Sequence, residues 1–333
     1  MLRLRTEIER VPLRQPIGCR EGILLLGSCF TDHIGTWLQE HWLPVMSNPW
    51  GVLFNPASIA LSLGRVLSRP SAYAEGTTEE RAQGAESDAR VTMHDAQFPL
   101  HELGGRYYSF AHHGRFSDTD PERLQLQLQQ LDLDVARFVR EECRHLIVTF
   151  GTSWVYEREG QVVANCHKFP ASDFIRRRLS VQEIVDLWAP LIQDAESSAP
   201  FHFVFTVSPI RHTHDTLHGN QLSKATLLLA IDELQRLYPD RVEYLPVYEL
   251  LNDDLRDYRF YADDLVHPSS LAVEAVRELV SDTCFTPQLR QYMSEADPIV
   301  RALQHRPSDP DSPQYQCFLH DTLQRKDALL AKY

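Results

Sequence analysis

The segment Gly27-Ser28-Cys29-Phe30 holds the residues with the clearest chemical use. It follows the short apolar run 22–27, which is typical of a buried strand, and precedes a helical pattern. A nucleophile fits such a strand-to-helix turn, because the N–H groups at a helix N-terminus lower the pKa of a thiol and stabilise an oxyanion. The alternative is a turn of small residues with a buried, inert cysteine.

Asp264 and His267 form a second pair of chemically useful residues. They lie three positions apart, immediately before Pro268 and a predicted helix. A turn at this place lets the carboxylate hold the imidazole in one tautomer, which gives the base and the orienting group that a nucleophile requires. A helix-capping aspartate beside a surface histidine is the alternative.

Histidines also gather after a later predicted strand, as His212, His214 and His218. Two imidazoles in an H-x-H pattern can hold a metal ion, which leaves a metalloenzyme as one alternative. No H-E-x-x-H motif is present, however, and Asp215 is the nearest carboxylate. We therefore expect no metal and no cofactor.

A fourth polar group, Asn165-Cys166-His167-Lys168, follows a predicted hairpin centred on Glu159-Gly160. Its amide, imidazole and ammonium groups suit an anionic or carbonyl substrate. The polar end of a surface hairpin is an equally simple interpretation.

Apolar runs and helical periodicity alternate along the chain. Strands are predicted at 22–27, 45–50, 145–150, 201–207 and 242–247, with a hairpin at 154–165. Helices are predicted from a cap at Thr31 or Asp32 to 41, and at 56–67, 121–142, 180–195, 221–237 and 271–283. This order predicts a mostly parallel sheet with helices on both faces, where ligands bind beyond the carboxyl ends of the strands. The polar segments at those ends are 28–29, 48–51, 151–154 and 208–214, joined by the loop 263–267.

Two segments depart from this alternation. The stretch 69–102 breaks the pattern, and its part 75–102 has seven acids against two arginines, so we interpret it as a surface insertion. The last 50 residues have apolar positions at helical spacing on either side of a Pro/Asp/Ser-rich link at 307–313. We therefore expect one α/β domain over 1–283 and a C-terminal helical extension over 284–333.

Composition excludes several classes of function. The 333-residue chain has 33 basic and 46 acidic residues, a net charge of −13, which disfavours nonspecific binding to nucleic acids or anionic lipids. Its apolar runs are far shorter than the roughly 20 residues of a membrane span, and no signal peptide is evident. The six cysteines are scattered without a C-x-x-C pair. We expect a cytoplasmic protein with free thiols and no nucleic-acid partner.

At this point the sequence resembles a known family. The run Leu26-Gly27-Ser28-Cys29-Phe30-Thr31 is similar to the motif that gives the GSCFA family its name, with Thr31 in place of the final alanine. Further blocks resemble the family in the same order, at 48–56, 150–156, 165–168, 208–212 and 264–269. The resemblance implies a place among the SGNH (GDSL-like) hydrolases, with their three-layer α/β/α flavodoxin-like fold, and ester hydrolysis or acyl transfer as the chemistry.

The resemblance also implies roles for single residues. The third place of the first block, where the superfamily has its serine nucleophile, is Cys29 here. Ser28 falls on the block's aspartate and stays an alternative nucleophile. Asp264 and His267 match the fifth-block D-x-x-H. Gly51 matches the second-block glycine, whose N–H helps to form the oxyanion hole.

The third block departs from the superfamily pattern. Gly-x-Asn-Asp is replaced by Gly151-Thr152-Ser153-Trp154, so the asparagine donor is missing. Ser153 or Asn165 is expected to complete the oxyanion hole, with His167 and His212 as further substrate-binding residues.

We therefore expect an acyl-ester hydrolase that acts on a small-molecule or glycan ester through an acyl-enzyme. Cys29 or Ser28 attacks the acyl carbonyl, and His267, oriented by Asp264, transfers the proton. An acyltransferase with the same machinery and a non-catalytic carbohydrate- or ligand-binding protein are the alternatives. The acyl group, the acceptor and the oligomeric state stay open.

Overall fold

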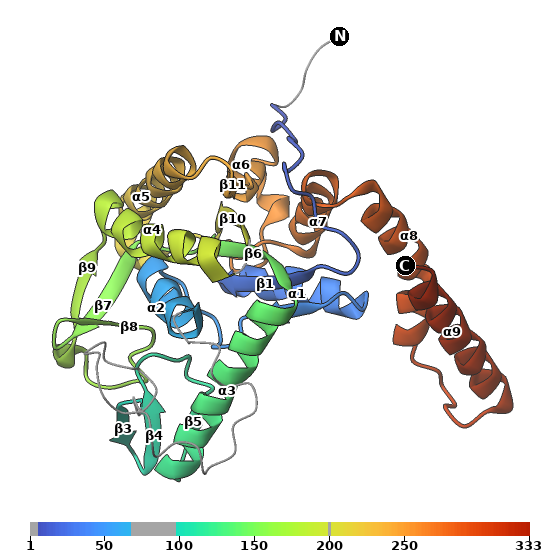
Figure 1. The fold of residues 1–333 in the computed structure, drawn as a ribbon, viewed down its shortest axis with the longest axis horizontal. Helices are drawn as coiled ribbons and strands as arrows, with labels where there is room; N and C mark the ends of the chain where they lie inside the picture. Colours follow the sequence, from blue (N-terminus) through green and yellow to red (C-terminus); the bar gives the residue numbers. More distant parts are fainter. Residues whose placement is uncertain (1–5, 68–97, 199–200) are drawn as a thin grey trace.

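A computed structural model describes the backbone of residues 6–67, 98–198 and 201–333, with their side chains except those of 29–30 and 196–198. Its central sheet has five parallel strands in the order β11-β10-β6-β1-β2 (Figure 1). Their bounds are β1 Gly22–Gly27, β2 Val45–Ser47, β6 Cys143–Phe150, β10 His202–Val207 and β11 Val242–Tyr244.

Helices cover both faces of this sheet. The helices on one face are α2 Pro56–Leu67, α3 Pro121–Glu141, α4 Val181–Ser198 and α5 Thr216–Leu237. Those on the other are α1 Cys29–Glu40 and α7 Ser270–Cys284. Leu24 and Leu26 of β1 pack in the first layer, whereas Ile23 and Leu25 pack in the second. The alternation follows from the two-residue period of a strand and confirms the three-layer α/β/α prediction.

The strand order places the candidate site. After β1 the chain forms β2 on one side, then returns past β1 to form β6, β10 and β11 on the other. The connections therefore diverge between β1 and β6, which is the topological switch point of a flavodoxin-like order. A ligand crevice is expected at the carboxyl ends of these two strands.

Two small antiparallel sheets lie on the side of the central sheet away from the C-terminal helices (Figure 1). One has β3 Leu100–Leu103, β4 Arg106–Ser109 and β5 Ser117–Asp118. The other joins the predicted hairpin, β7 Trp154–Arg158 and β8 Gln161–Val163, to an unpredicted third strand, β9 Ile175–Arg178. Of the expected insertion 69–102, residues 69–97 lie outside the described residues, and 100–102 belong to β3.

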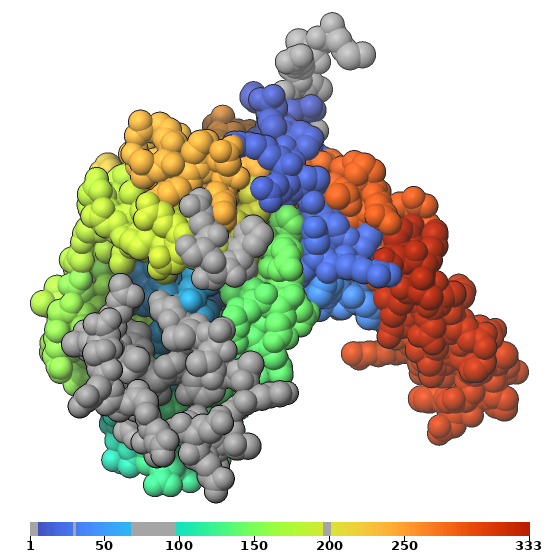
Figure 2. Space-filling model, viewed as in Figure 1, coloured from blue at the N-terminus to red at the C-terminus, as the bar shows by residue number. Residues whose placement is uncertain are grey.

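The predicted helical extension consists of α8 Pro287–Gln304 and α9 Pro313–Lys332. Figure 2 shows this pair as an arm at the edge of the molecule. Both helices contact the body: the Tyr292 hydroxyl on α8 donates to the His41 carbonyl at 2.6 Å, and Arg20 Nε donates to the Tyr333 backbone oxygen, just after α9, at 2.7 Å. None of the helices in the described parts of the chain is long and apolar enough to cross a membrane.

Short elements complete the chain, and some boundaries differ from prediction. The short elements are η3 Ala171–Asp173, η4 Thr213–Asp215, α6 Val247–Glu249, the π-helix η5 Leu250–Asp254 and η6 Tyr258–Phe260. Helix α1 begins at Cys29, earlier than the cap predicted at Thr31 or Asp32, because β1 ends abruptly at Gly27. Helix α5 begins five residues before the predicted start.

The turn after β1 requires glycine at position 27. Gly27 has φ +138°, and a Cβ there would lie 2.2 Å from the Thr149 carbonyl oxygen on β6. We expect Gly27→Ala to lower the free energy of unfolding by at least about 3 kcal/mol, because strain and a backbone clash add. Chemical denaturation tests this. Gly105→Ala, with positive φ but open space around it, should cost only about 1–2 kcal/mol, and equal losses would contradict the close approach.

Candidate active site

Asn48 holds the end of β1 against the first turn of α1. Its Oδ1 accepts from the Gly27 N–H at 2.8 Å, and its Nδ2 donates to Asp32 Oδ1 at 2.7 Å. The Leu53 N–H donates to the Gly27 carbonyl at 3.1 Å. The loop after β2 therefore fixes the backbone of the strand-to-helix turn from one side.

This turn places Cys29 and Ser28 differently. Cys29 is the first residue of α1, where the free N–H groups and the positive end of the helix dipole favour a negative charge. Ser28 is the preceding cap residue, but its side chain makes no capping bond and is only 2% exposed. Its buried Oγ has no hydrogen-bond partner within the described residues. The hydroxyl of Ser28 is thus shielded from solvent.

The second-block glycine is engaged in a turn. The Gly51 N–H donates to the Asn48 carbonyl at 2.8 Å, and a Cβ on Gly51 would lie 2.2 Å from His113 Cβ. The Arg115 guanidinium donates to the carbonyls of Asn48 and Pro49 at 2.9 and 2.8 Å. The expectation that the Gly51 N–H is an oxyanion donor is therefore corrected, because this N–H already serves the turn.

The third-block loop, residues 151–154, is bonded to Phe54 and to Ser223 of α5. Gly151 and Thr152 donate their N–H groups to the Phe54 carbonyl at 2.8 and 3.0 Å. Ser153 is fully buried, and its N–H and Oγ both bond to Ser223 Oγ, at 2.8 and 3.1 Å. Ser153 thus does not replace the missing asparagine as an oxyanion donor; its polar groups stabilise the loop.

The lysine Lys224 is buried at the same strand ends, and no prediction from the sequence included it. Its Nζ donates to the carbonyls of Gly151 and Ser208, which follow β6 and β10, at 2.6 Å each. The side chain is 1% exposed, and burial lowers its pKa to about 7. Removal from water disfavours the charged ammonium form of Lys224, and the hydrogen bonds to the two carbonyls stabilise that form.

His212 follows β10, as the sequence predicted. It also lies beside Lys224, which the sequence did not predict. Its Nε2 is 3.2 Å from the Gly151 carbonyl, and its backbone N–H donates to Asn220 Oδ1 at 3.0 Å. Burial, and then the positive charge of Lys224, lower the pKa of His212 to about 4. The imidazole is therefore neutral at pH 7, and it donates from Nε2 because a carbonyl only accepts.

The sequence does contain a signal for Lys224. In α5, the buried positions Asn220, Ser223, Lys224, Leu227 and Ile231 follow the helical spacing of a face directed at the core. A lysine on such a face must find polar partners inside the protein. The sequence pattern alone does not show that those partners are the ends of two strands.

Lys224→Met is expected to lower the free energy of unfolding by about 1–3 kcal/mol, because the Ser208 carbonyl loses its donor and the Gly151 carbonyl keeps only the bond from His212. Urea denaturation measures the loss. Lys168→Met, at an exposed lysine, is the matched control and should change stability by less than about 0.5 kcal/mol. Equal stability of the two variants would show that the buried ammonium contributes nothing.

Asp264 and His267 form the predicted dyad in the loop before α7. Asp264 Oδ2 lies 2.6 Å from His267 Nδ1, while Oδ1 accepts the N–H groups of Val266 and His267 at 2.9 Å. The backbone bonds, and then the bond to the imidazole, lower the pKa of Asp264 to about 2. Both side chains are half exposed, and His267 Nε2 has no partner among the described residues. This geometry fixes one tautomer and leaves Nε2 available for a proton.

The loop that carries the dyad is joined to the sheet edge. Tyr261 forms an isolated bridge with Pro268, and the Ala262 N–H donates to the His267 carbonyl at 2.8 Å. Arg211, which follows β10, donates to the Tyr261 hydroxyl at 2.9 Å. The β10 end and the dyad loop are thereby held together.

Asn165 and His167 lie next to Gly114, in the segment whose His113 contacts Gly51. The Asn165 Oδ1 accepts the His167 N–H at 2.8 Å, and His167 Nε2 donates to the Ser109 carbonyl at 2.8 Å. His167 is 6% exposed, so its expected contact with substrate is corrected to a structural role. A Cβ on Gly114 would lie 3.8 Å from both side chains, next to His113. Asn165 thus supports the segment that covers Gly51.

The three histidines of the metal alternative do not converge. His212 bonds to a backbone carbonyl, whereas His214 is exposed and lies 3.7 Å from Asp215. Throughout the described residues, no group of three or more His, Cys, Asp or Glu side chains is placed to hold a metal ion. The metalloenzyme alternative therefore gains no support from the geometry.

Comparison with known proteins gives two family matches. The GSCFA family profile matches residues 22–279, and the profile of the C-terminal domain of GSCFA domain proteins matches 296–333. No curated protein is a match. A solved structure described as a candidate platelet activating factor from Streptococcus pneumonia is similar over 47% of this chain, with 16% identity and a TM-score of 0.29. The match covers 65% of that protein, less than two thirds of its length.

Proposed function

The chain belongs to the GSCFA family, and on that basis, together with the geometry of the sheet edge, we propose that it is an acyl-ester hydrolase. The observation that carries the proposal is the Asp264–His267 dyad, joined to the same edge of the sheet at which Cys29 begins α1. A nucleophile, a base and an orienting carboxylate are the parts of a catalytic triad. We also propose that the family belongs with the SGNH hydrolases, which the strand order and the D-x-x-H pair support.

In the proposed reaction, the thiol of Cys29 gives its proton to His267 Nε2, and the sulfur attacks the acyl carbonyl. The C–O bond to the alcohol breaks, and the imidazolium returns the proton to the leaving oxygen. Water then attacks the thioester, with His267 again as base, which releases the acid and restores the thiol. Asp264 stabilises the imidazolium and remains ionised throughout, in agreement with its low pKa.

The oxyanion is proposed to bind at the N-terminus of α1. Its first N–H groups have no partners within the helix, and the helix dipole adds positive potential there. Gly51 and Ser153 do not contribute, because their N–H groups are already bonded. This separates the proposal from the superfamily pattern, in which an asparagine side chain helps.

The test is hydrolysis of 4-nitrophenyl acetate and 4-nitrophenyl octanoate by the full chain, followed as release of 4-nitrophenolate. We expect turnover of at least one ester, which His267→Ala lowers about 10²-fold or more. Release that occurs only with an added alcohol acceptor, and that yields a new ester, would make the protein an acyltransferase. No release with either ester or acceptor would contradict the proposal.

A further inference from the structure

A small cavity lies beside the candidate active site, and none of the roles assigned above uses it. Its volume is about 200 Å³, and its lining residues are Arg211, Leu251, Asn252, Arg256, Asp257, Tyr258 and Tyr261. Arg211 immediately precedes His212, and Tyr261 is bridged to Pro268, the neighbour of His267. The cavity thus lies between the β10 end and the segment 251–261, which leads into the dyad loop.

Two tyrosines hold the guanidinium of Arg211 in place. It lies 4.5 Å from the ring centre of Tyr261 and 5.8 Å from that of Tyr258. One N–H donates to the Tyr261 hydroxyl at 2.9 Å. No carboxylate pairs with Arg211 within the described residues, so its other N–H donors are oriented but without an anionic partner.

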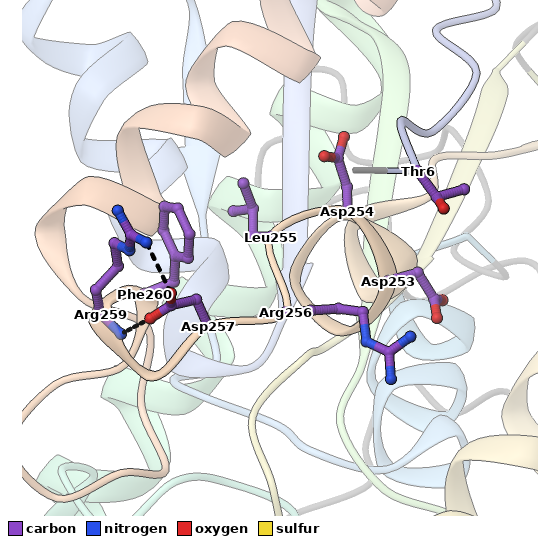
Figure 3. A pocket seen from close by; sticks show the side chains of 8 residues that line it. All are labelled: Thr6, Asp253, Asp254, Leu255, Arg256, Asp257, Arg259 and Phe260. Atoms are coloured by element: carbon purple, nitrogen blue, oxygen red, sulfur yellow. Dashed lines mark hydrogen bonds and ion pairs between the residues drawn. The ribbon is translucent and has the colours of Figure 1, made fainter. Parts of the chain in front are cut away.

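A second guanidinium, Arg256, lines the same cavity. The carboxylate next to it, Asp257, is already bonded to the Arg259 N–H and guanidinium at 2.9 and 2.8 Å. Figure 3 shows an adjacent pocket that Arg256 also lines, and in it the Arg256 side chain extends away from the Asp257–Arg259 pair. In the described parts of the chain Arg256 has no ion-pair partner. Two unpaired arginines at one cavity are notable in a protein with a net charge of −13.

We propose that this cavity binds a carboxylate carried by the ester substrate, an inference that rests on the proposed hydrolase function. Planar guanidinium groups bind carboxylates through paired hydrogen bonds, and two of them offer more positive charge than one carboxylate needs. At a liquid-water volume of about 30 Å³ per molecule, the cavity holds about six or seven water-sized groups. It therefore has room for a carboxylate with a few carbons.

Matched ester pairs that differ in one charge test the proposal. One pair, 4-acetoxybenzoate and its methyl ester, places the carboxylate on the alcohol side. The other, mono-4-nitrophenyl adipate and methyl 4-nitrophenyl adipate, places it on the acyl side. We expect kcat/KM to favour the charged member of one pair by about tenfold or more, the size expected for charge-assisted hydrogen bonds. That pair also identifies the side that carries the charge.

Variants connect the preference to the cavity. Arg256→Gln should lower the ratio of charged to neutral kcat/KM about tenfold, and Arg256→Glu should invert the preference. Arg301→Gln, which removes an exposed positive charge on α8, is the control and should keep the wild-type ratio. Absence of a charge preference in both pairs, or equal ratios for Arg256→Gln and Arg301→Gln, would overturn the proposal.

A binding measurement separates this proposal from the proposed function. Calorimetric titration with 4-hydroxybenzoate and with monomethyl adipate requires no turnover. Binding that Arg256→Gln weakens about tenfold, in a protein that hydrolyses none of the esters, would support the carboxylate site and contradict the hydrolase. Turnover without charge preference and without binding of either probe would leave the hydrolase standing and overturn the carboxylate site.

Discussion

Cys29→Ala is expected to lower kcat/KM for 4-nitrophenyl acetate at least about 10³-fold, because the acyl-enzyme can no longer form. The substitution is at the first position of α1, and alanine is compatible with a helix there. Initial rates of 4-nitrophenolate release, with circular dichroism to verify folding, measure the effect. Cys317→Ala is the matched control, because that cysteine is exposed on α9.

Ser28→Ala distinguishes the two candidate nucleophiles. It is expected to retain a measurable fraction of the activity, because the Ser28 hydroxyl is buried at the cap position. Iodoacetamide should also modify Cys29 faster than the other cysteines, with loss of turnover at the same rate. An inactive Ser28→Ala together with an active Cys29→Ala would make this a serine enzyme with its nucleophile one position earlier.

His267→Ala and the double variant Asp264→Ala/His267→Ala are expected to lose activity to a similar depth, about 10²-fold or more. The carboxylate acts only through the imidazole that it orients, so its removal costs nothing further once the imidazole is gone. Steady-state kinetics on the two single variants and the double variant measure the coupling.

Folding must be retained in these variants for the comparison to hold. Both side chains are half exposed, which makes a large loss of stability unexpected. Asp134→Ala, at a half-exposed carboxylate of α3 that pairs with Arg137, controls for the loss of a surface carboxylate. If the double variant fell below His267→Ala by the full cost of Asp264→Ala, the two residues would act independently and the dyad assignment would be wrong.

Local sequence patterns predicted the central strands and the loop of the dyad. β1 is a short apolar run and the strand 145–150 is mostly apolar; glycine ends both, and this pattern is typical of a buried strand. The bond between Asp264 and His267 joins residues three positions apart, so a turn is sufficient to form it. For the same reason the β7–β8 hairpin was predicted correctly around Glu159-Gly160.

Long-range contacts explain what the sequence did not predict. The polar groups of Ser153 bond to Ser223, 70 residues later, and Lys224 reaches a carbonyl 73 residues earlier. Neither contact follows from periodicity. Gly51 was matched by its place in a motif, but the motif does not show that the Asn48 carbonyl takes its N–H. The assigned oxyanion donors therefore changed, whereas the candidate nucleophile and base did not.

The central claim is that Cys29 forms an acyl-enzyme, and mass spectrometry after acid quench tests it most directly. 4-Nitrophenyl trimethylacetate is the probe, because its bulky acyl group slows hydrolysis of the intermediate. We predict one added trimethylacetyl group per chain, located on Cys29 by fragmentation and released by neutral hydroxylamine as a thioester. An adduct on Ser28 that resists hydroxylamine, or no adduct in a protein that releases 4-nitrophenolate, would contradict the account.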